Sequence, residues 1–387
     1  MNTHSFTLSG TLPGLSADEL ARVSAPLEDA WTLPTGAYTD PDLYELEIER
    51  IMRKSWLPVG RVDQVPNPGD YICFTLYDQP LMLVRGTDGN VRVMSRVCLH
   101  RAAPIAEGEG NRKLFSCPYH AWSYATDGQL VRAPLMEGAE GFDEKSCKLP
   151  ELRTEIWEGF VLVNFNDDAE PFAPQVATFQ KTFSNYKFED MVIIKTLEFD
   201  SPWNWKVLVE NFMEAYHHIA IHKTTFEPVY PAKDSKIPDA DGPYSILHMP
   251  SIEPHADDAD GLPLIEGLEE WQKKDLLATV LFPNFLLAFQ GTSATWYQIT
   301  PASVDRFHLK IHFMVPKSSA ELPNIDEIAE GAGALLSVIH HEDIEANDMV
   351  WEGLKAPLTS QGRLSPLERS IWQLNQWWLR ELTKTEA

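Results

Sequence analysis

Two short segments of the chain each combine one cysteine with one histidine. They are Cys98-x-His100 and Cys117-x2-His120, separated by sixteen residues. Two thiolates and two imidazoles are the ligands of a Rieske [2Fe-2S] cluster, in which the cysteines hold one iron and the histidines the other. Neutral imidazole ligands raise the reduction potential of such a cluster above that of an all-cysteine cluster. The spacing therefore predicts an electron-transfer centre.

A structural zinc site is the alternative for these four residues, because Cys and His also bind zinc tetrahedrally. Zinc fingers place two cysteines close together and then two histidines, whereas here each segment mixes one Cys with one His. This difference favours the iron–sulfur cluster. The remaining cysteines, Cys73 and Cys147, are expected to be reduced thiols.

A second group of metal-binding residue types lies about ninety residues further on. Apolar residues recur with helical spacing over 205–216, so Glu210, Glu214 and His217 are expected on one helix face. In an ideal helix His217 and His222 would point roughly 140° apart. Both can bind one metal only if the helix ends or bulges after His217. The alternative is a pair of ordinary histidines at a helix end.

Asp343 is the candidate for a third ligand. It lies in the apolar stripe of a helix predicted over 326–351, where an aliphatic residue is expected, whereas Glu342 and Glu345 are expected to face solvent. A buried carboxylate is costly unless it is paired with a cation or a metal. Two histidines and one carboxylate form the non-haem Fe(II) site that activates dioxygen. The alternative for Asp343 is a salt bridge to a basic residue.

Composition limits the classes of partner. With 387 residues, 44% of them apolar, the chain can form two or three domains with sizeable cores. A net charge of −25 argues against binding to nucleic acid or to anionic membranes. No apolar run is long enough to span a bilayer, and the start lacks a signal pattern, so we expect a cytoplasmic protein.

A basic patch near the cluster could receive an acidic redox partner. Its residues are Arg96, Arg101, Arg112 and Lys113.

The distribution of residue types along the sequence predicts three segments and an α+β fold. Residues 1–45 form an N-terminal helical segment, and residues 46–165, with short β-branched runs between turns, form a small all-β Rieske [2Fe-2S] domain. Residues 166–387 form a larger α+β catalytic domain with an antiparallel sheet flanked by helices. In that domain strands are expected over 281–289, 295–300 and 307–316, and a last helix over 366–382.

These motifs together resemble the catalytic α-subunit of the Rieske non-haem iron oxygenases, the ring-hydroxylating oxygenase family. The resemblance covers residues 43–382 and implies a terminal oxygenase with a Rieske [2Fe-2S] cluster and a mononuclear Fe(II). It rests on Cys98-x-His100, Cys117-x2-His120, Glu214-x2-His217-x4-His222 and Asp343.

The resemblance also implies roles for these residues. Cys98 and Cys117 would hold the buried iron of the cluster, and His100 and His120 the outer one. The mononuclear iron would be held by His217, His222 and Asp343. A reductase or ferredoxin would supply electrons, which would cross from His120 through Glu214 to His217 of an adjacent subunit in a head-to-tail homotrimer.

The expected reaction is monooxygenation of a small organic substrate, by hydroxylation or by oxidative N- or O-dealkylation. Many ring-dihydroxylating members have Asp where this chain has Glu214, and Glu resembles the members that attack quaternary amines. One alternative is a dioxygenase that forms cis-dihydrodiols from an arene, and another is a Rieske electron carrier without oxygenase activity. Candidate pocket residues are Leu208, Phe212, Ile219, Phe226, Phe285, Leu287, Phe289 and Trp296. Expected supporting residues are Trp122 and Tyr124 around the cluster, and Glu210, Asn211 and His218 behind the iron ligands.

Overall fold

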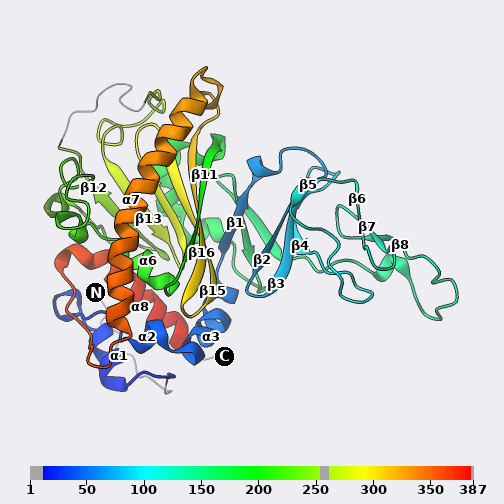
Figure 1. Ribbon diagram of the computed structural model, residues 1–387, viewed down its shortest axis with the longest axis horizontal. Helices are drawn as coiled ribbons and strands as arrows, with labels where there is room; N and C mark the ends of the chain where they lie inside the picture. Colours follow the sequence, from blue (N-terminus) through cyan, green and yellow to red (C-terminus); the bar gives the residue numbers. More distant parts are fainter. Residues whose placement is uncertain (1–11, 253–260, 385–387) are drawn as a thin grey trace. The chain divides into compact units, whose positions relative to one another are not determined.

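The computed structural model describes residues 12–252 and 261–384 (Figure 1). The chain divides into two compact units. The smaller unit comprises residues 56–172, and the larger unit combines the chain before residue 56 with the chain from residue 173 onwards. Among the described residues, no helix is both long and apolar enough to cross a membrane.

The smaller unit is an all-β assembly of three small sheets, with strand orders β1-β10-β9, β4-β3-β2-β5 and β6-β7-β8. All pairings are antiparallel. The strands are β1 (Leu57–Arg61), β2 (Asp70–Leu76), β3 (Gln79–Arg85), β4 (Val91–Ser95), β5 (Glu109–Asn111), β6 (Leu114–Ser116), β7 (Ser123–Ala125), β8 (Leu130–Arg132), β9 (Arg153–Trp157) and β10 (Phe160–Asn164).

The larger unit is built on a six-stranded antiparallel sheet of order β11-β16-β15-β14-β13-β12. Its two longest strands pair along their whole length. The strands are β11 (Met191–Ser201), β12 (Tyr244–Met249), β13 (Leu276–Leu281), β14 (Phe285–Phe289), β15 (Ala294–Ser303) and β16 (Arg306–Pro316). The single strand expected over 281–289 is therefore the end of β13, a tight turn and β14.

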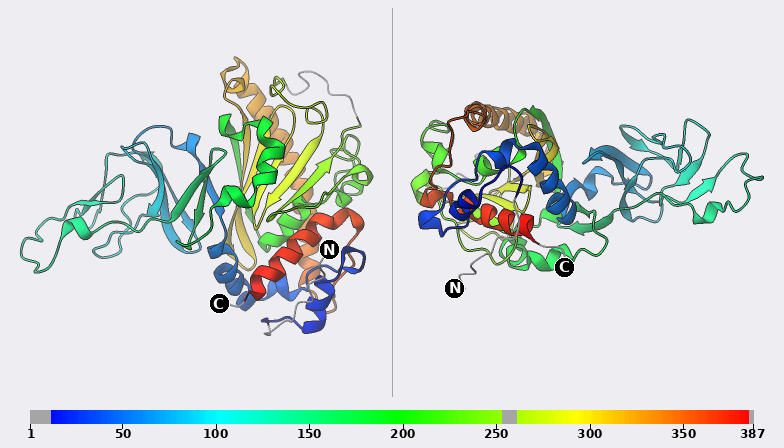
Figure 2. Two further views of the ribbon diagram at one scale, coloured as in Figure 1. Left: turned by 180° about the vertical axis from the view of Figure 1, so that it is seen from behind. Right: turned by 90° about the horizontal axis from the view of Figure 1, so that it is seen from below.

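Helices cover both faces of this sheet. The 30-residue helix α7 lies across one face, and the short helix α5 lies on the other (Figures 1 and 2). The helices are α1 (Ala17–Val23), α2 (Gly36–Thr39), α3 (Pro41–Arg50), α4 (Phe172–Gln175), α5 (Ala177–Phe183), α6 (Trp205–Phe212), α7 (Ile325–Leu354) and α8 (Arg369–Thr383). The α+β class, with an all-β Rieske domain and an antiparallel sheet flanked by helices, is confirmed.

The N-terminal segment packs on the larger unit and continues past the expected end at residue 45. Helix α3 runs to Arg50, and its buried Glu47 accepts hydrogen bonds from the Lys206 ammonium at 2.7 Å and from the Trp378 indole at 2.5 Å. Lys206 lies on α6 and Trp378 on α8, so a buried ion pair joins three elements that are distant in sequence. The compact smaller unit begins at Trp56.

Candidate iron–sulfur and mononuclear iron sites

The two cysteine–histidine segments form loops of the same construction. In each loop the cysteine N–H donates to the carbonyl five residues later, and the cysteine carbonyl accepts from the N–H four residues later. The residues four positions after Cys98 and Cys117 are Ala102 and Ala121, whose φ angles of 53° and 57° are in the left-handed region. The two loops therefore share one backbone conformation around their cysteines.

The thiols and imidazoles of these loops differ in exposure. Cys98 and Cys117 are buried and free of disulfides, whereas His100 and His120 are exposed, with ring centroids 4.5 Å apart. Buried thiolates with imidazoles at the surface fit the two ends of a [2Fe-2S] cluster. Within the described residues, the one group of three such side chains with ligand atoms within 4.8 Å of one another lies in the larger unit.

Two aromatic side chains pack around these ligands, as expected. The indole of Trp122 stacks on the His100 ring at 4.9 Å, with 9° between the planes. The Tyr124 hydroxyl lies 3.3 Å from Cys98 Sγ and accepts the backbone N–H of Leu99 at 3.0 Å. Burial raises the pKa of Tyr124, so the phenol stays protonated and can donate toward sulfur.

The second ligand group is formed where α6 ends. The helix stops at Phe212, earlier than the predicted end, and a 3-10 turn over Tyr216–Ile219 redirects the chain. This break brings the His217 and His222 rings to a centroid distance of 4.9 Å. A continuous helix would have separated them, so the required interruption is present but begins before Glu214.

Asp343 of α7 completes this group. Its Oδ1 lies 3.0 Å from His222 Nε2 and 3.7 Å from His217 Nε2, and it is only 8% exposed. Its ion-pair partners in the described chain are these two imidazoles, in place of the lysine or arginine of the alternative interpretation. Ligand atoms from all three side chains lie within 4.8 Å of one another. Two imidazoles and one carboxylate fit an Fe(II) with open positions opposite.

Each of these histidines has a carboxylate on its second nitrogen. Glu214 Oε1 lies 2.5 Å from His217 Nδ1, and Glu342 Oε2 lies 2.7 Å from His222 Nδ1 and accepts from the Thr225 hydroxyl at 2.8 Å. Such partners fix the orientation of ligand imidazoles and leave Nε2 for the metal. The expectation that Glu342 faces solvent is wrong, because the loop that carries His222 covers that side of α7.

The other residues expected behind the ligands have different positions. His218 and Asn211 line the small cavity beside the three ligands, and burial with the neighbouring histidines lowers the pKa of His218 to about 3. Glu210 faces away from that cavity and accepts a 2.7 Å hydrogen bond from the buried Tyr38 hydroxyl. Burial raises the pKa of Glu210 to about 7. Burial lowers the pKa of His222, but Asp343 and Glu342 outweigh it and raise the value.

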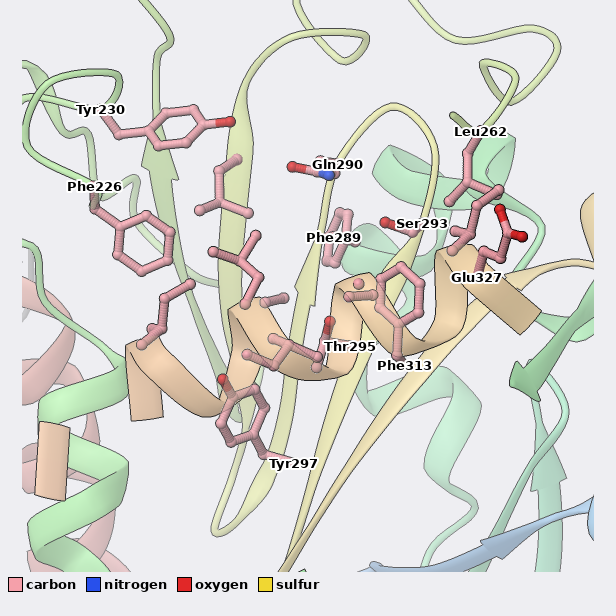
Figure 3. A pocket seen from close by; sticks show the side chains of 18 of the residues that line it. Phe226, Tyr230, Leu262, Phe289, Gln290, Ser293, Thr295, Tyr297, Phe313 and Glu327 are labelled. Carbon is pink, nitrogen blue, oxygen red and sulfur yellow. The ribbon is translucent and has the colours of Figure 1, made fainter. Parts of the chain in front are cut away.

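Two cavities adjoin each other, and the smaller one reaches the ligand group. The small one, about 70 Å³, is lined by His217, His222 and Asp343. The large one, about 580 Å³, lies between α7 and the sheet, and Figure 3 shows the side chains around it. The residues that line both cavities are Phe226, Leu276, Ala288, Tyr297 and Ile339.

Half of the expected pocket residues line these cavities. Those that do are Leu208, Phe212, Phe226 and Phe289, and those that do not are Ile219, Phe285, Leu287 and Trp296. Leu287 and Trp296 lie opposite each other on β14 and β15, so they share a sheet face. Thr295 and Tyr297 line the large cavity instead. They precede and follow Trp296 on β15, so their side chains point to the opposite face of the sheet.

The two ligand groups define a class of protein. A cysteine–histidine loop pair in an all-β unit and a two-histidine, one-carboxylate group beside an antiparallel sheet together define an oxygenase with two iron centres. The family model of the ring-hydroxylating α-subunit catalytic domain matches residues 188–384, and that of the Rieske [2Fe-2S] domain matches residues 55–150. The chain belongs to the ring-hydroxylating α-subunit family of Rieske non-haem iron oxygenases.

Relatives of known activity agree with this assignment. The chain is 27% identical over 360 residues to the chloroplastic choline monooxygenase of Spinacia oleracea, an alignment that covers 91% of this chain and 78% of the relative. It is 33% identical over 193 residues to the carnitine monooxygenase oxygenase subunit of Escherichia coli K12, covering 49% of this chain and 52% of the relative.

Solved structures share the fold. A quaternary ammonium Rieske monooxygenase superposes with a TM-score of 0.81 at 22% identity, covering 96% of this chain and 100% of the other. Naphthalene 1,2-dioxygenase from a Rhodococcus species superposes with a TM-score of 0.79 at 17% identity, covering 95% and 99%. By its family membership and its relatives, the protein is a terminal oxygenase that uses a [2Fe-2S] cluster, a mononuclear Fe(II), O2, a small organic substrate and electrons from a partner protein.

Proposed function

We propose that this protein is a monooxygenase of organic amines, in which one oxygen atom enters a carbon bound to nitrogen. The observation that carries the proposal is the Glu214–His217 pair, a glutamate at the position where many ring-dihydroxylating members have aspartate. The relatives named for choline and carnitine monooxygenation support it. The likeness to naphthalene dioxygenase, at 17% identity, concerns the fold.

The reaction consumes the C–H bond and O2 with two electrons and two protons, and it yields the C–OH product and water. Hydroxylation next to nitrogen gives a carbinolamine, which breaks to the dealkylated amine and an aldehyde. When bound, the cluster supplies single electrons and the mononuclear iron is the site of dioxygen activation.

The side chains around the small cavity would bind the iron and orient its ligands for this reaction. We assign His217, His222 and Asp343 as the iron ligands, with Glu214 and Glu342 orienting the two imidazoles. The apolar lining of the cavity excludes bulk water from the reacting carbon. An electron carrier would have no use for this second ligand group.

We further propose that Cys98, Cys117, His100 and His120 hold the cluster, and that the active form is a homotrimer. The exposed His120 imidazole would donate electrons toward Glu214 of a neighbouring subunit. A ring of head-to-tail contacts provides one such route for every subunit.

A product screen tests the proposal. The purified holoenzyme, a surrogate reductase and NADH are incubated under ¹⁸O2 with amines, methoxyarenes and simple arenes. We expect loss of an alkyl group from an amine, with one ¹⁸O atom in the aldehyde formed. The Asp343→Ala variant should give no product, and the exposed Glu345→Ala variant should match wild type. An arene product with two added oxygens and two added hydrogens would contradict monooxygenation.

A further inference from the structure

The large cavity follows helix α7 from Ile339, four positions before Asp343, to Glu327 near the helix start. Glu327, Gly331, Leu335 and Ile339 of α7, at four-residue intervals, line the large cavity, and Ile339 and Asp343 line the small one. Ile339 lies twelve positions after Glu327, which corresponds to a rise of about 18 Å along the axis. The space along the helix is therefore long (Figure 3), and the small cavity at its Ile339 end reaches Asp343.

The volume of this space suits a molecule larger than choline. Ligand pockets of about 300–1,000 Å³ hold drug-sized molecules. At about 580 Å³ the large cavity falls in that range, whereas the small cavity of about 70 Å³ accommodates a terminal group. A compound as small as choline would leave most of the large cavity filled only with water.

The lining is apolar and aromatic, with one carboxylate at its far end. Phe226, Phe289 and Phe313 contribute ring surfaces, and of the described residues that line the cavity only Glu327 is an acid and none is Lys or Arg. Aromatic faces and a carboxylate attract cations, and the net charge of −25 adds to this preference. A ligand with a carboxylate at the Glu327 end would lack a counter-charge.

A glycine keeps the middle of this space open. Gly331 is exposed and lines the large cavity, and a Cβ atom added there would meet no other atom within 4 Å. Glycine weakens a helix interior relative to alanine. A larger side chain at Gly331 would extend into the space beside the lining.

We propose that the substrate is an elongated, largely apolar molecule with a cationic group at each end. The oxidised N-alkyl group lies in the small cavity beside Asp343, the apolar body passes Tyr297 and Gly331, and the second cation lies at Glu327. The position of the oxidised end rests on the function proposed above.

Binding measurements on the holoenzyme test this proposal without turnover. Isothermal titration calorimetry compares choline, decyltrimethylammonium, decamethonium and (10-carboxydecyl)trimethylammonium. Decyltrimethylammonium should bind at least about a hundredfold more tightly than choline, because its alkyl chain is buried. Decamethonium should bind about fivefold more tightly than decyltrimethylammonium, since exposed ion pairs contribute modestly. The carboxylate probe should bind most weakly of the three long compounds.

Two variants assign these preferences to the cavity. Glu327→Gln should remove the advantage of decamethonium over decyltrimethylammonium, whereas Asp326→Asn, an acid of the same helix turn outside the lining, should retain it. Gly331→Leu should weaken all long probes at least about tenfold without affecting choline. Gly353→Leu, which also has open space at its Cβ but lies outside the lining, should bind like wild type.

The results separate this inference from the proposed function. If choline binds as tightly as the long probes, or if Gly331→Leu leaves decamethonium affinity unchanged, the elongated substrate is wrong even if choline is oxidised. If the predicted affinities are found but no bound amine is dealkylated, the cavity assignment stands and the proposed reaction fails. An unchanged decamethonium advantage in Glu327→Gln would refute the role of the far-end carboxylate.

Discussion

The two carboxylate oxygens of Glu214 hold His217 in two ways. Oε1 lies 2.5 Å from Nδ1 of the imidazole, and Oε2 accepts the backbone N–H of His217 at 3.0 Å. The ring is consequently fixed with Nε2 toward Asp343, at 3.7 Å from Oδ1. One side chain thereby sets both the turn of the chain and the direction of a proposed metal ligand.

Removing the charge of Glu214 should slow electron delivery without loss of metal. Glu214→Gln keeps the size and much of the hydrogen bonding of the side chain, so we expect wild-type content of both iron centres. Re-oxidation of the reduced cluster, followed by stopped flow with substrate and oxygen, should slow by at least about a hundredfold. The Glu345→Gln variant is the control on an exposed position. A wild-type rate in Glu214→Gln would show that electrons take another route.

Asp343 should be required for the mononuclear iron alone. The Asp343→Ala variant should fall from about three irons per chain to about two, because a cluster holds two and the damaged site holds one. The cluster should keep its visible absorption and its electron paramagnetic resonance signal. Iron analysis with both spectra measures this, and Asp348→Ala is the matched acid on the same helix. Loss of iron from Asp348→Ala but not from Asp343→Ala would mean that the wrong acid is assigned.

Glu342 should control how tightly the iron is bound. Removing a partner of a ligand imidazole typically costs about 10- to 100-fold in metal affinity. Competition with a chelator should show a loss in this range for Glu342→Ala and a smaller loss for Thr225→Val, which removes only the hydroxyl that donates to Glu342. Equal iron retention in wild type and Glu342→Ala would leave the carboxylate with a packing role.

Glu210 should make stability depend on pH. Burial raises its pKa from 4.5 to about 7, so the folded protein holds this proton more tightly than the unfolded chain. Its stabilising contribution is complete below pH 4.5 and is lost as the pH rises through about 7. Glu210→Gln should therefore gain roughly 3 kcal/mol over wild type at pH 8 and little at pH 4.5. Urea unfolding at both pH values measures this, with the exposed Glu198→Gln as control. A constant difference across pH would contradict it.

The four residues of the expected basic patch make different contacts. Arg112 lies over the Tyr71 ring and Arg96 donates to the Ala106 carbonyl, whereas Arg101 donates to the Tyr119 hydroxyl beside His120. Lys113 is exposed. Lys113→Glu should raise the apparent KM for an acidic donor several-fold at low salt and flatten its salt dependence. Lys187→Glu, in the larger unit, is the charge control. Identical donor kinetics in Lys113→Glu and wild type would place docking elsewhere.

Local spacing indicated the candidate ligands more readily than the residues that surround them. Cys98 and Cys117 were recognisable because each has its histidine within three residues, and Asp343 because a carboxylate interrupts an apolar stripe. The contact of Glu342 with His222 joins residues 120 positions apart, and no periodicity reports such a contact. Likewise, the sequence shows that Trp296 and Tyr297 point to opposite sheet faces, but only tertiary packing decides which face α7 covers.

The straight run of α7 has a consequence for where a substrate is attacked. If one end of a long molecule is held at Glu327 and oxygen enters beside Asp343, the number of helix residues between them determines which carbon is hydroxylated. The length of the helix then sets the distance between the held end and the oxidised carbon, and each added or removed turn shifts the site of oxidation by about 5.4 Å along the molecule. Regioselectivity in this protein would then depend on the residue count of a single helix.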